Sequence, residues 1–349
     1  MAKTLFVGSY TENAQGAGVT SWAVDAAGHL IEQRAASTGV RNPSYLVWQQ
    51  ERLFAVEELE EGAVVELDPI TLEVITRVSS GGSSPCHLAP CTWNAGVEGE
   101  LPAQGLIVSN YSSGTVALLN ITEALTGPLD TVVQHGGGPV RDRQEGPHAH
   151  SSQQTPWGSV LVADLGRDSI DEYTLHNSRL IHSGSITLPP GTGPRHMRLL
   201  GNTLLVVGEL DAMIHVLDHN GLSWHWRGAS QLFDVENQTL AMTDGLYPSE
   251  ILSLPHVSRA LVAVRGRNSI AVVEVPERPV MPFLTAEVST AGDWPRHMAL
   301  AGPGASVLYV ANERSHNIEL FVMNEAGDLT VEPVQSIAVG SPSCVLPVG

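Results

Sequence analysis

The chain of 349 residues is 42% hydrophobic and only 16% charged, which is the composition of a folded globular protein rather than of a disordered one. Its 37 acidic and 18 basic side chains give a formal net charge of −19, which repels nucleic-acid phosphates and anionic membrane surfaces. We therefore predict no nucleic-acid partner and no membrane partner. A small anionic ligand would need a local cluster of arginines to overcome this field.

The N-terminal segment and the cysteines favour a soluble protein of the cytoplasm. The apolar stretch after Lys3 is only Leu-Phe-Val, too short for the core of a secretory signal, and no later run reaches membrane-spanning length. Cys86, Cys91 and Cys344 are too few for a disulfide framework and form no CxxC or CxxH zinc pattern. This cysteine usage fits a reducing compartment.

Two short apolar segments near the N-terminus predict strands. They are KTLFVGSY at 3–10 and GVTSWAV at 18–24. From residue 42 onwards a proline-centred motif then recurs seven times, at separations of 42 to 62 residues. The seven copies are NPSYL at Pro43, SPCHL at Pro85, GPHAH at Pro147, GPRHM at Pro194, YPSEI at Pro248, WPRHM at Pro295 and SPSCV at Pro342.

Two further short runs follow each of the first six prolines, and both are rich in β-branched residues and bounded by Gly, Asn, Asp or Ser. Such runs predict strands joined by hairpin turns. The first set is LFAVEE, LIVSNY, LVADLG, LVVGEL, LVAVRG and LYVANE. The second set lies at 63–67, 115–119, 169–173, 213–217, 269–273 and 317–321.

A unit of about 50 residues with four short strands, repeated seven times, is typical of a β-propeller blade. The seventh proline opens a strand that has no partner after it, whereas the N-terminal strands lack an inner strand before them. We therefore predict an all-β, seven-bladed propeller in one domain, 1–349, closed when the C-terminal strand joins the N-terminal blade. Extra length at 90–104, 134–146 and 224–245 predicts surface loops that border the binding face.

In a propeller, equivalent positions of successive inner strands form a ring around one axis. The two residues after each proline are unusually polar for strand starts. The first position holds Ser44, Cys86, His148, Arg195, Ser249, Arg296 and Ser343. The second holds Tyr45, His87, Ala149, His196, Glu250, His297 and Cys344. The ends of the second strands, expected on the same face, hold Leu59, Tyr111, Leu165, Glu209, Arg265 and Glu313.

The ordered motifs QEGPHAHS with VADLGRDSI, GTGPRHM with GELDAMI, YPSEI with VRGRNSI, and WPRHM with VANERSHNI resemble the seven-bladed lactonase family. This family includes bacterial 6-phosphogluconolactonase and the fungal 3-carboxy-cis,cis-muconate lactonising enzyme. By motif, the resemblance implies a catalytic set of His148, Arg195, Glu209 and Arg265. Val264 and Gly208 stand where the family usually has Asn, so the amides beside two charged residues are lost.

Opening a lactone needs a base that deprotonates water and positive charge where the oxyanion develops. His148 or Glu209 can be the base, and Arg195 and Arg265 can bind an anionic group or the oxyanion. Further substrate-binding candidates on the predicted ring are His87, His196, Arg296 and His297.

Each of these candidates also has a structural interpretation. An Arg beside a Glu can be a structural ion pair between blades, and Arg296 and His297 can be remnants of repetition. His148 and His150 share a strand face but have no evident third metal ligand. We predict no metal and no cofactor.

Three functions remain open at the level of sequence. The first is hydrolysis of a small anionic sugar lactone, 6-phosphogluconolactone to 6-phosphogluconate. The second is cyclisation of a carboxylated muconate, since both substrates are small anions. The third is a propeller that serves as a scaffold without catalysis, because a fold does not by itself imply a function.

Overall fold

The computed structural model describes residues 3–12, 15–94, 101–234, 236 and 245–349. Seven four-stranded antiparallel sheets account for its twenty-eight strands, with two short 3₁₀ turns, η1 (Leu165–Arg167) and η2 (Pro303–Ala305). The chain divides into two compact units. The first comprises Met1–Thr38, Ile70–Leu72 and Arg198–Gly349, and the second comprises Gly39–Pro69 and Glu73–Met197.

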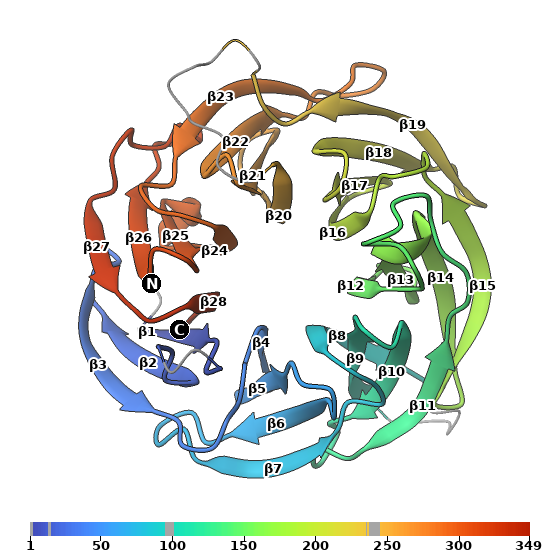
Figure 1. Cartoon of the computed structure of the whole chain (residues 1–349), viewed down its shortest axis with the longest axis horizontal. Coiled ribbons are helices and arrows are strands. Elements are labelled where there is room, and N and C mark those ends of the chain that lie inside the picture. The colour runs from blue at the N-terminus through green and yellow to red at the C-terminus, as the bar shows by residue number, and fades with distance from the viewer. Residues whose placement is uncertain (1–2, 13–14, 95–100, 235, 237–244) are drawn as a thin grey trace. The chain divides into compact units, whose positions relative to one another are not determined.

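Three sheets lie in the second unit, and each follows chain order from its inner to its outer strand (Figure 1). The first contains β4 (Leu46–Gln49), β5 (Arg52–Glu57), β6 (Ala63–Leu67) and β7 (Val74–Ser79). The second contains β8 (Pro85–Trp93), β9 (Ala103–Asn110), β10 (Thr115–Asn120) and β11 (Pro128–Val133). The third contains β12 (Ala149–Gln154), β13 (Ser159–Asp164), β14 (Ser169–His176) and β15 (Arg179–Thr187).

The boundary between the units falls inside β16 (Pro194–Leu200), which precedes β17 (Thr203–Gly208), β18 (Met213–His219) and β19 (Trp224–Gln231) in the fourth sheet. The fifth and sixth sheets belong to the first unit. The fifth contains β20 (Tyr247–Ser253), β21 (Arg259–Arg265), β22 (Ser269–Glu274) and β23 (Phe283–Ser289). The sixth contains β24 (Pro295–Ala301), β25 (Val307–Asn312), β26 (Asn317–Val322) and β27 (Gln335–Ala338).

The seventh sheet joins the two ends of the chain, in the order β28 (Pro342–Val348), β1 (Thr4–Ser9), β2 (Val19–Val24) and β3 (Leu30–Ala36). Val345 of β28 lies opposite Val7 of β1, and Figure 1 shows the two strands side by side. The predicted pairing of the C-terminal strand with the N-terminal blade is therefore confirmed.

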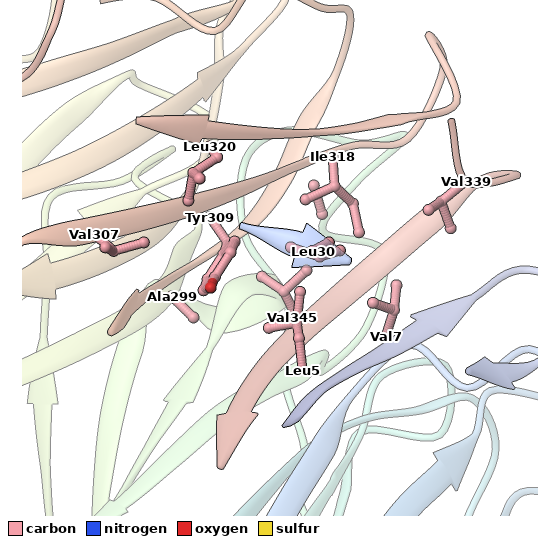
Figure 2. Close-up of a cluster of buried hydrophobic side chains, with 11 residues drawn as sticks. Leu5, Val7, Leu30, Ala299, Val307, Tyr309, Ile318, Leu320, Val339 and Val345 are labelled. Carbon is pink, nitrogen blue, oxygen red and sulfur yellow. The ribbon is translucent and has the colours of Figure 1, made fainter. Parts of the chain in front are cut away.

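The burial pattern explains why the sequence signal is strong in the middle strands. β5, β13, β21 and β25 are buried along almost their whole length, because the faces of their sheets are covered on both sides. Outer strands such as β7 alternate between half-buried and exposed residues. Figure 2 shows one core cluster of the first unit, where Leu5, Val345 and Leu30 pack with Tyr309.

Two of the three predicted insertions contain strand, contrary to expectation. Pro90–Trp93 continue β8 because Cys91 and Trp93 turn inward and pack in the core of their unit, and Ala103 already opens β9. Trp224–Gln231 form β19, hydrogen-bonded to β18. The remainder of these segments includes 95–100, 235 and 237–244, which lie outside the described residues. Segment 134–146 contains no strand, as predicted.

Candidate active site

The repeated proline marks the end of each blade where the candidate residues gather. β8, β16, β24 and β28 all begin at this proline. The second strand runs antiparallel, so its last residue lies beside the first residue of the inner strand. Arg265, for example, ends β21 opposite Tyr247 at the start of β20. The predicted proximity of these two strand ends is confirmed within this blade.

In three blades, the backbone N–H of the residue before the proline donates a hydrogen bond to a side chain of the preceding blade. Asp168 accepts the Gly193 N–H at 2.7 Å, Asn268 accepts the Trp294 N–H at 2.9 Å, and His316 Nδ1 accepts the Ser341 N–H at 3.0 Å. These three acceptors and the three residues they bind all have positive φ, between 42° and 67°. We call each contact a latch, because it fixes the start of the next inner strand.

In the second unit, His148 is buried and held at both ring nitrogens. Its Nδ1 lies 2.9 Å from the Tyr111 carbonyl oxygen, which can only accept, so Nδ1 carries the proton of the neutral ring. The ring stacks on Tyr111 with centroids 4.4 Å apart. In this neutral form Nε2 has the lone pair, and it lies 3.3 Å from Glu145 Oε1, an acceptor to which Nε2 can donate once the ring has taken up a proton. This tautomer is the one that a general base needs.

Two carboxylates frame His148. Backbone hydrogen bonding at Glu145 lowers the pKa of that exposed carboxyl, and contact with His148 acts in the same direction. Asp164 accepts the His148 backbone N–H at 2.8 Å and the Arg167 N–H at 3.1 Å. Burial raises the pKa of Asp164 to about 6, although both hydrogen bonding to His148 and the charge of Arg167 favour its ionised form.

A chain of rings extends from His148 through the second unit. Tyr111 contacts His150 edge-on with centroids 5.6 Å apart, and His150 contacts His196 at the same distance. His196 and His87 are 5.4 Å apart, and Tyr45 packs against His87 at 4.3 Å. The structure thus brings the predicted His87, His196 and His148 into one connected group.

The neighbouring Arg195 is also buried, and its carbonyl oxygen accepts a hydrogen bond from Ser151 Oγ at 2.5 Å. Within the described ranges, no three His, Cys, Asp or Glu side chains form a group suited to a metal ion.

The first unit holds the other two charged candidates as a buried pair. Arg265 Nη2 donates to Glu209 Oε2 at 2.6 Å, and Arg265 Nε donates to the Tyr247 carbonyl at 3.0 Å. Only 7% of the Arg265 side chain and 5% of the Glu209 side chain are exposed. The guanidinium carbon also lies 5.3 Å from the centre of the Trp294 ring. Three contacts therefore fix the direction of the Arg265 guanidinium group.

His297 and Arg296, which repeat the Arg195-His196 sequence, contact carboxylates of the first unit. His297 Nδ1 accepts the Val345 N–H at 3.4 Å, while Nε2 lies 3.2 Å from Glu250 Oε2. Both nitrogens of this imidazole are therefore engaged, which leaves it no lone pair for base catalysis. Arg296 Nη1 lies 3.7 Å from Glu313 Oε2, a looser contact than that of Arg265.

The candidate residues are thus distributed over both units. His148, Arg195, His196 and His87 belong to the second, whereas Glu209, Arg265, Arg296 and His297 belong to the first. Their convergence on one substrate stays a prediction. Sequence reasoning missed Glu145, Asp164 and Trp294 as partners of the candidates. Glu145 stands three residues before His148 in the QEGPHAH motif, which is the one signal that could have indicated it.

Seven four-stranded blades, with the last strand completing the first blade, define an all-β protein of the seven-bladed propeller class. A family model described as "Lactonase, 7-bladed beta-propeller" matches residues 4–347, so the chain belongs to this lactonase family. It is 29% identical to the 6-phosphogluconolactonase of Bacillus subtilis, over 97% of each chain.

Two solved structures share the fold. A protein from Lactobacillus plantarum is 25% identical, with a TM-score of 0.85 over 99% of each chain. The periplasmic gluconolactonase of Pseudomonas aeruginosa is 24% identical, with a TM-score of 0.84 over the same share of each chain, and this likeness shows the fold alone. None of the helices in the described residues is long and apolar enough to cross a membrane. The cytoplasmic location stays a prediction.

Proposed function

We propose that this protein hydrolyses the ring ester of a small anionic sugar lactone, with 6-phosphogluconolactone as the substrate and 6-phosphogluconate as the product. The observation that carries the proposal is the tautomer of His148, whose Nδ1–H is bound to the Tyr111 carbonyl so that Nε2 can accept a proton. Membership of the lactonase family and the Bacillus subtilis relative support the hydrolytic direction.

The proposed reaction begins when His148 Nε2 takes a proton from a water molecule whose oxygen attacks the lactone carbonyl carbon. The carbonyl oxygen becomes an oxyanion, and a guanidinium group stabilises it. The intermediate then collapses by breaking the bond between the carbonyl carbon and the ring oxygen. The ring oxygen takes the proton back from His148, which yields the open-chain acid with its free hydroxyl group.

His148 is a better base in this scheme than Glu209. The Glu209 carboxylate already accepts a 2.6 Å hydrogen bond from Arg265, which stabilises its charged form and reduces its tendency to accept a proton. Glu209 instead fixes the Arg265 guanidinium as a preorganised positive charge. When His148 is protonated, the Glu145 carboxylate at 3.3 Å stabilises the imidazolium.

The roles of the two arginines complete the proposal. Arg195 and Arg265 bind the anionic substituent and the developing oxyanion, for which the planar guanidinium fork is suited. The buried setting of the Arg265–Glu209 pair supports a catalytic role, because a fixed charge that has already lost its water needs no reorganisation during the reaction.

The test is hydrolysis of 6-phosphoglucono-1,5-lactone above its spontaneous rate, followed by coupling to 6-phosphogluconate dehydrogenase. His148→Gln should lower kcat by about 10² to 10⁴, the usual contribution of a positioned base. His176→Gln is the matched control, because this histidine is exposed on the same blade. Absence of catalysed hydrolysis would sink the proposal. Faster cyclisation of 3-carboxy-cis,cis-muconate would favour the alternative, and inactivity on both would favour a scaffold.

A further inference from the structure

The buried side chain of Gln144 joins segment 134–146 to the η1 turn. Gln144 is 2% exposed, and its Oε1 atom accepts the Val140 N–H at 3.0 Å. Its Nε2 atom donates to the Leu165 carbonyl at 2.8 Å and to Asp168 Oδ1 at 2.7 Å. A carbonyl oxygen and a carboxylate oxygen only accept, so the orientation of the amide is fixed. The amide oxygen and both amide protons are thus engaged.

The bond to Leu165 acts on the turn that packs against the proposed base. The Leu165 N–H donates to the His148 carbonyl at 2.9 Å, so this one residue contacts Gln144 on one side and His148 on the other. A Cβ atom at Gly166 would come within 2.9 Å of the His148 ring carbon Cδ2. The η1 turn therefore lies directly against the imidazole ring, and Gln144 holds that turn in place.

The backbone of Gln144 also fixes its neighbour Glu145. The Gln144 N–H donates to the Val140 carbonyl at 2.7 Å, and the Gly138 N–H donates to the Gln144 carbonyl at 3.0 Å. Glu145 Oε1 lies 3.3 Å from His148 Nε2. The carboxylate that stabilises the protonated base is therefore presented from a segment whose backbone is closed by hydrogen bonds.

The bond to Asp168 acts on the strand that carries Arg195. Asp168 is 4% exposed, and its Oδ1 atom also accepts the Gly193 N–H at 2.7 Å. Its Oδ2 atom accepts the Gly191 N–H at 2.7 Å. A buried carboxylate depends on such donors to offset its loss of water. Gln144 therefore supports the latch that fixes the backbone two residues before Arg195.

We propose that Gln144 is a positioning residue of the lactonase reaction, which holds the base His148 and the guanidinium of Arg195 relative to each other. We call the contacts of its amide with Leu165 and Asp168 the amide frame. The inference rests on the proposed function and goes beyond it, because it assigns a role to a residue that is buried away from solvent. Glutamine is suited to this role, since a glutamate would turn a second carboxylate toward Asp168 instead of a donor.

The first test replaces the amide while keeping a side chain of similar size. Gln144→Met removes all three side-chain hydrogen bonds and should lower kcat/KM for 6-phosphoglucono-1,5-lactone by about 100-fold, because misplacing a catalytic group by about 1 Å has an effect of this size. Asp168→Ala, which breaks only the arm toward Arg195, should lower it by about 10-fold. Because both changes break the same hydrogen bond, the loss in the double variant should be smaller than the product of the single losses by about 3-fold or more. Losses that simply multiply would overturn the amide frame.

Gln154→Met is the matched control. Gln154 also makes three side-chain hydrogen bonds, to the carbonyls of Thr92 and Gly158 at 2.7 and 3.2 Å and from the Thr92 N–H at 2.9 Å. It is the last residue of β12, whereas His148 directly precedes the first. The control should lose stability but keep kcat/KM within about 3-fold of the wild type. Equal losses of kcat/KM in folded Gln144→Met and Gln154→Met would show that Gln144 serves the fold alone.

Hydrogen exchange and NMR test the amide frame without the reaction. In Gln144→Met the Gly193 amide should exchange about 10-fold faster than in the wild type, and the ring resonances of His148 should shift. Gln154→Met should change neither. Unchanged exchange and unchanged resonances in folded Gln144→Met would overturn the proposal, even if the wild type hydrolyses the lactone.

The same measurements separate the amide frame from the proposed reaction. A wild type that hydrolyses no lactone, with both changes present in Gln144→Met, would support the amide frame and overturn only the reaction. Gln144→Asn keeps an amide on a side chain that is one methylene shorter. It takes the place of Gln144→Met in every comparison if the methionine variant does not fold.

Discussion

Glu209 and Arg265 form a charge-assisted hydrogen bond of 2.6 Å, in which less than a tenth of either side chain is exposed. Removing two charges from water is costly, and their mutual attraction only offsets this cost when the geometry is good. Such a pair is a weak source of stability but a precise way to orient a guanidinium group. Arg259, at the other end of β21, pairs with Glu274 in a more exposed setting. There, 22% of the Arg259 side chain and 31% of the Glu274 side chain are exposed.

The two pairs of β21 predict different stability losses. Glu209→Ala should lower the free energy of unfolding by about 3 to 5 kcal/mol, because it leaves the Arg265 charge buried and uncompensated. The double variant Glu209→Ala with Arg265→Met should recover part of this loss. Glu274→Ala should cost only about 1 kcal/mol, because that pair is partly solvated. Equilibrium unfolding in guanidinium chloride measures the free energy of unfolding of all three variants. Equal losses of stability in the two single variants would contradict the argument.

The proline repeats show how much of the fold could be predicted from sequence. A proline at the start of an inner strand and an apolar run after it set the period, and the middle strands agree because their two buried faces demand continuous apolar residues. β19 was missed because WHWRGASQ has one solvated face, and its Trp, His and Arg residues resemble a loop when strand pairing is not known.

Within the site, the sequence could predict which side chains lie at one end of a blade. It could not predict which hydrogen-bond partners each of them finds there. His148 and His297 occupy adjacent positions of the same motif, and a carboxylate lies beside Nε2 of each ring. They differ at Nδ1, which faces the Tyr111 carbonyl oxygen in His148 and the Val345 N–H in His297. Tyr111, Val345 and Glu250 all lie between 37 and 48 residues away in the chain from the histidine that they contact. No local spacing encodes them.

Asp164 predicts a pH dependence of stability. Burial raises its pKa from 3.8 to about 6, so the proton is bound more tightly in the folded state. The resulting stabilisation is complete below pH 3.8 and is lost as the pH rises through 6. When the pH is lowered from 7 to 5, the unfolding free energy of the wild type should rise by about 1 kcal/mol relative to that of Asp164→Asn.

Denaturant unfolding at the two pH values measures this difference. Asp142→Asn, which changes an exposed carboxylate, should follow the wild type. A wild type and an Asp164→Asn variant with parallel pH profiles would show that Asp164 does not take up a proton in this range.

The Asp168 latch predicts that Arg195 is positioned from a distance. Asp168 accepts the N–H groups of Gly191 and Gly193 at 2.7 Å, four and two residues before Arg195. Asp168→Ala should cost about 1 to 3 kcal/mol of stability, because these donors lose their acceptor. It should also lower kcat/KM for the lactone about 10-fold, because Arg195 is no longer held in place.

The equivalent latch of the sixth blade is the control. His316→Ala removes the acceptor of the Ser341 N–H, but Ser343 stands there in the position of Arg195. This variant should lose stability with a much smaller loss of activity. If both variants lost activity in proportion to stability, the latch would be structural only.

The pairing of β28 with β1 predicts that the last strand can be supplied separately. A chain that ends at residue 339 exposes the edge of β1, together with the core surface that Cys344 and Val345 cover. An unpaired edge of this kind promotes aggregation. A synthetic peptide of residues 340–349 should restore solubility and a thermal transition close to that of the whole chain, because it adds a strand to the edge.

The same peptide with Val345→Asp should fail, since Val345 is 1% exposed and lies opposite Val7 in the core of the first unit. A carboxylate there would either be buried without a partner or force the strand away. The full-length chain should unfold in one cooperative transition if residues 1–349 form a single domain. A truncated chain that stayed soluble and active without the peptide would show that closure by the C-terminal strand contributes nothing to folding.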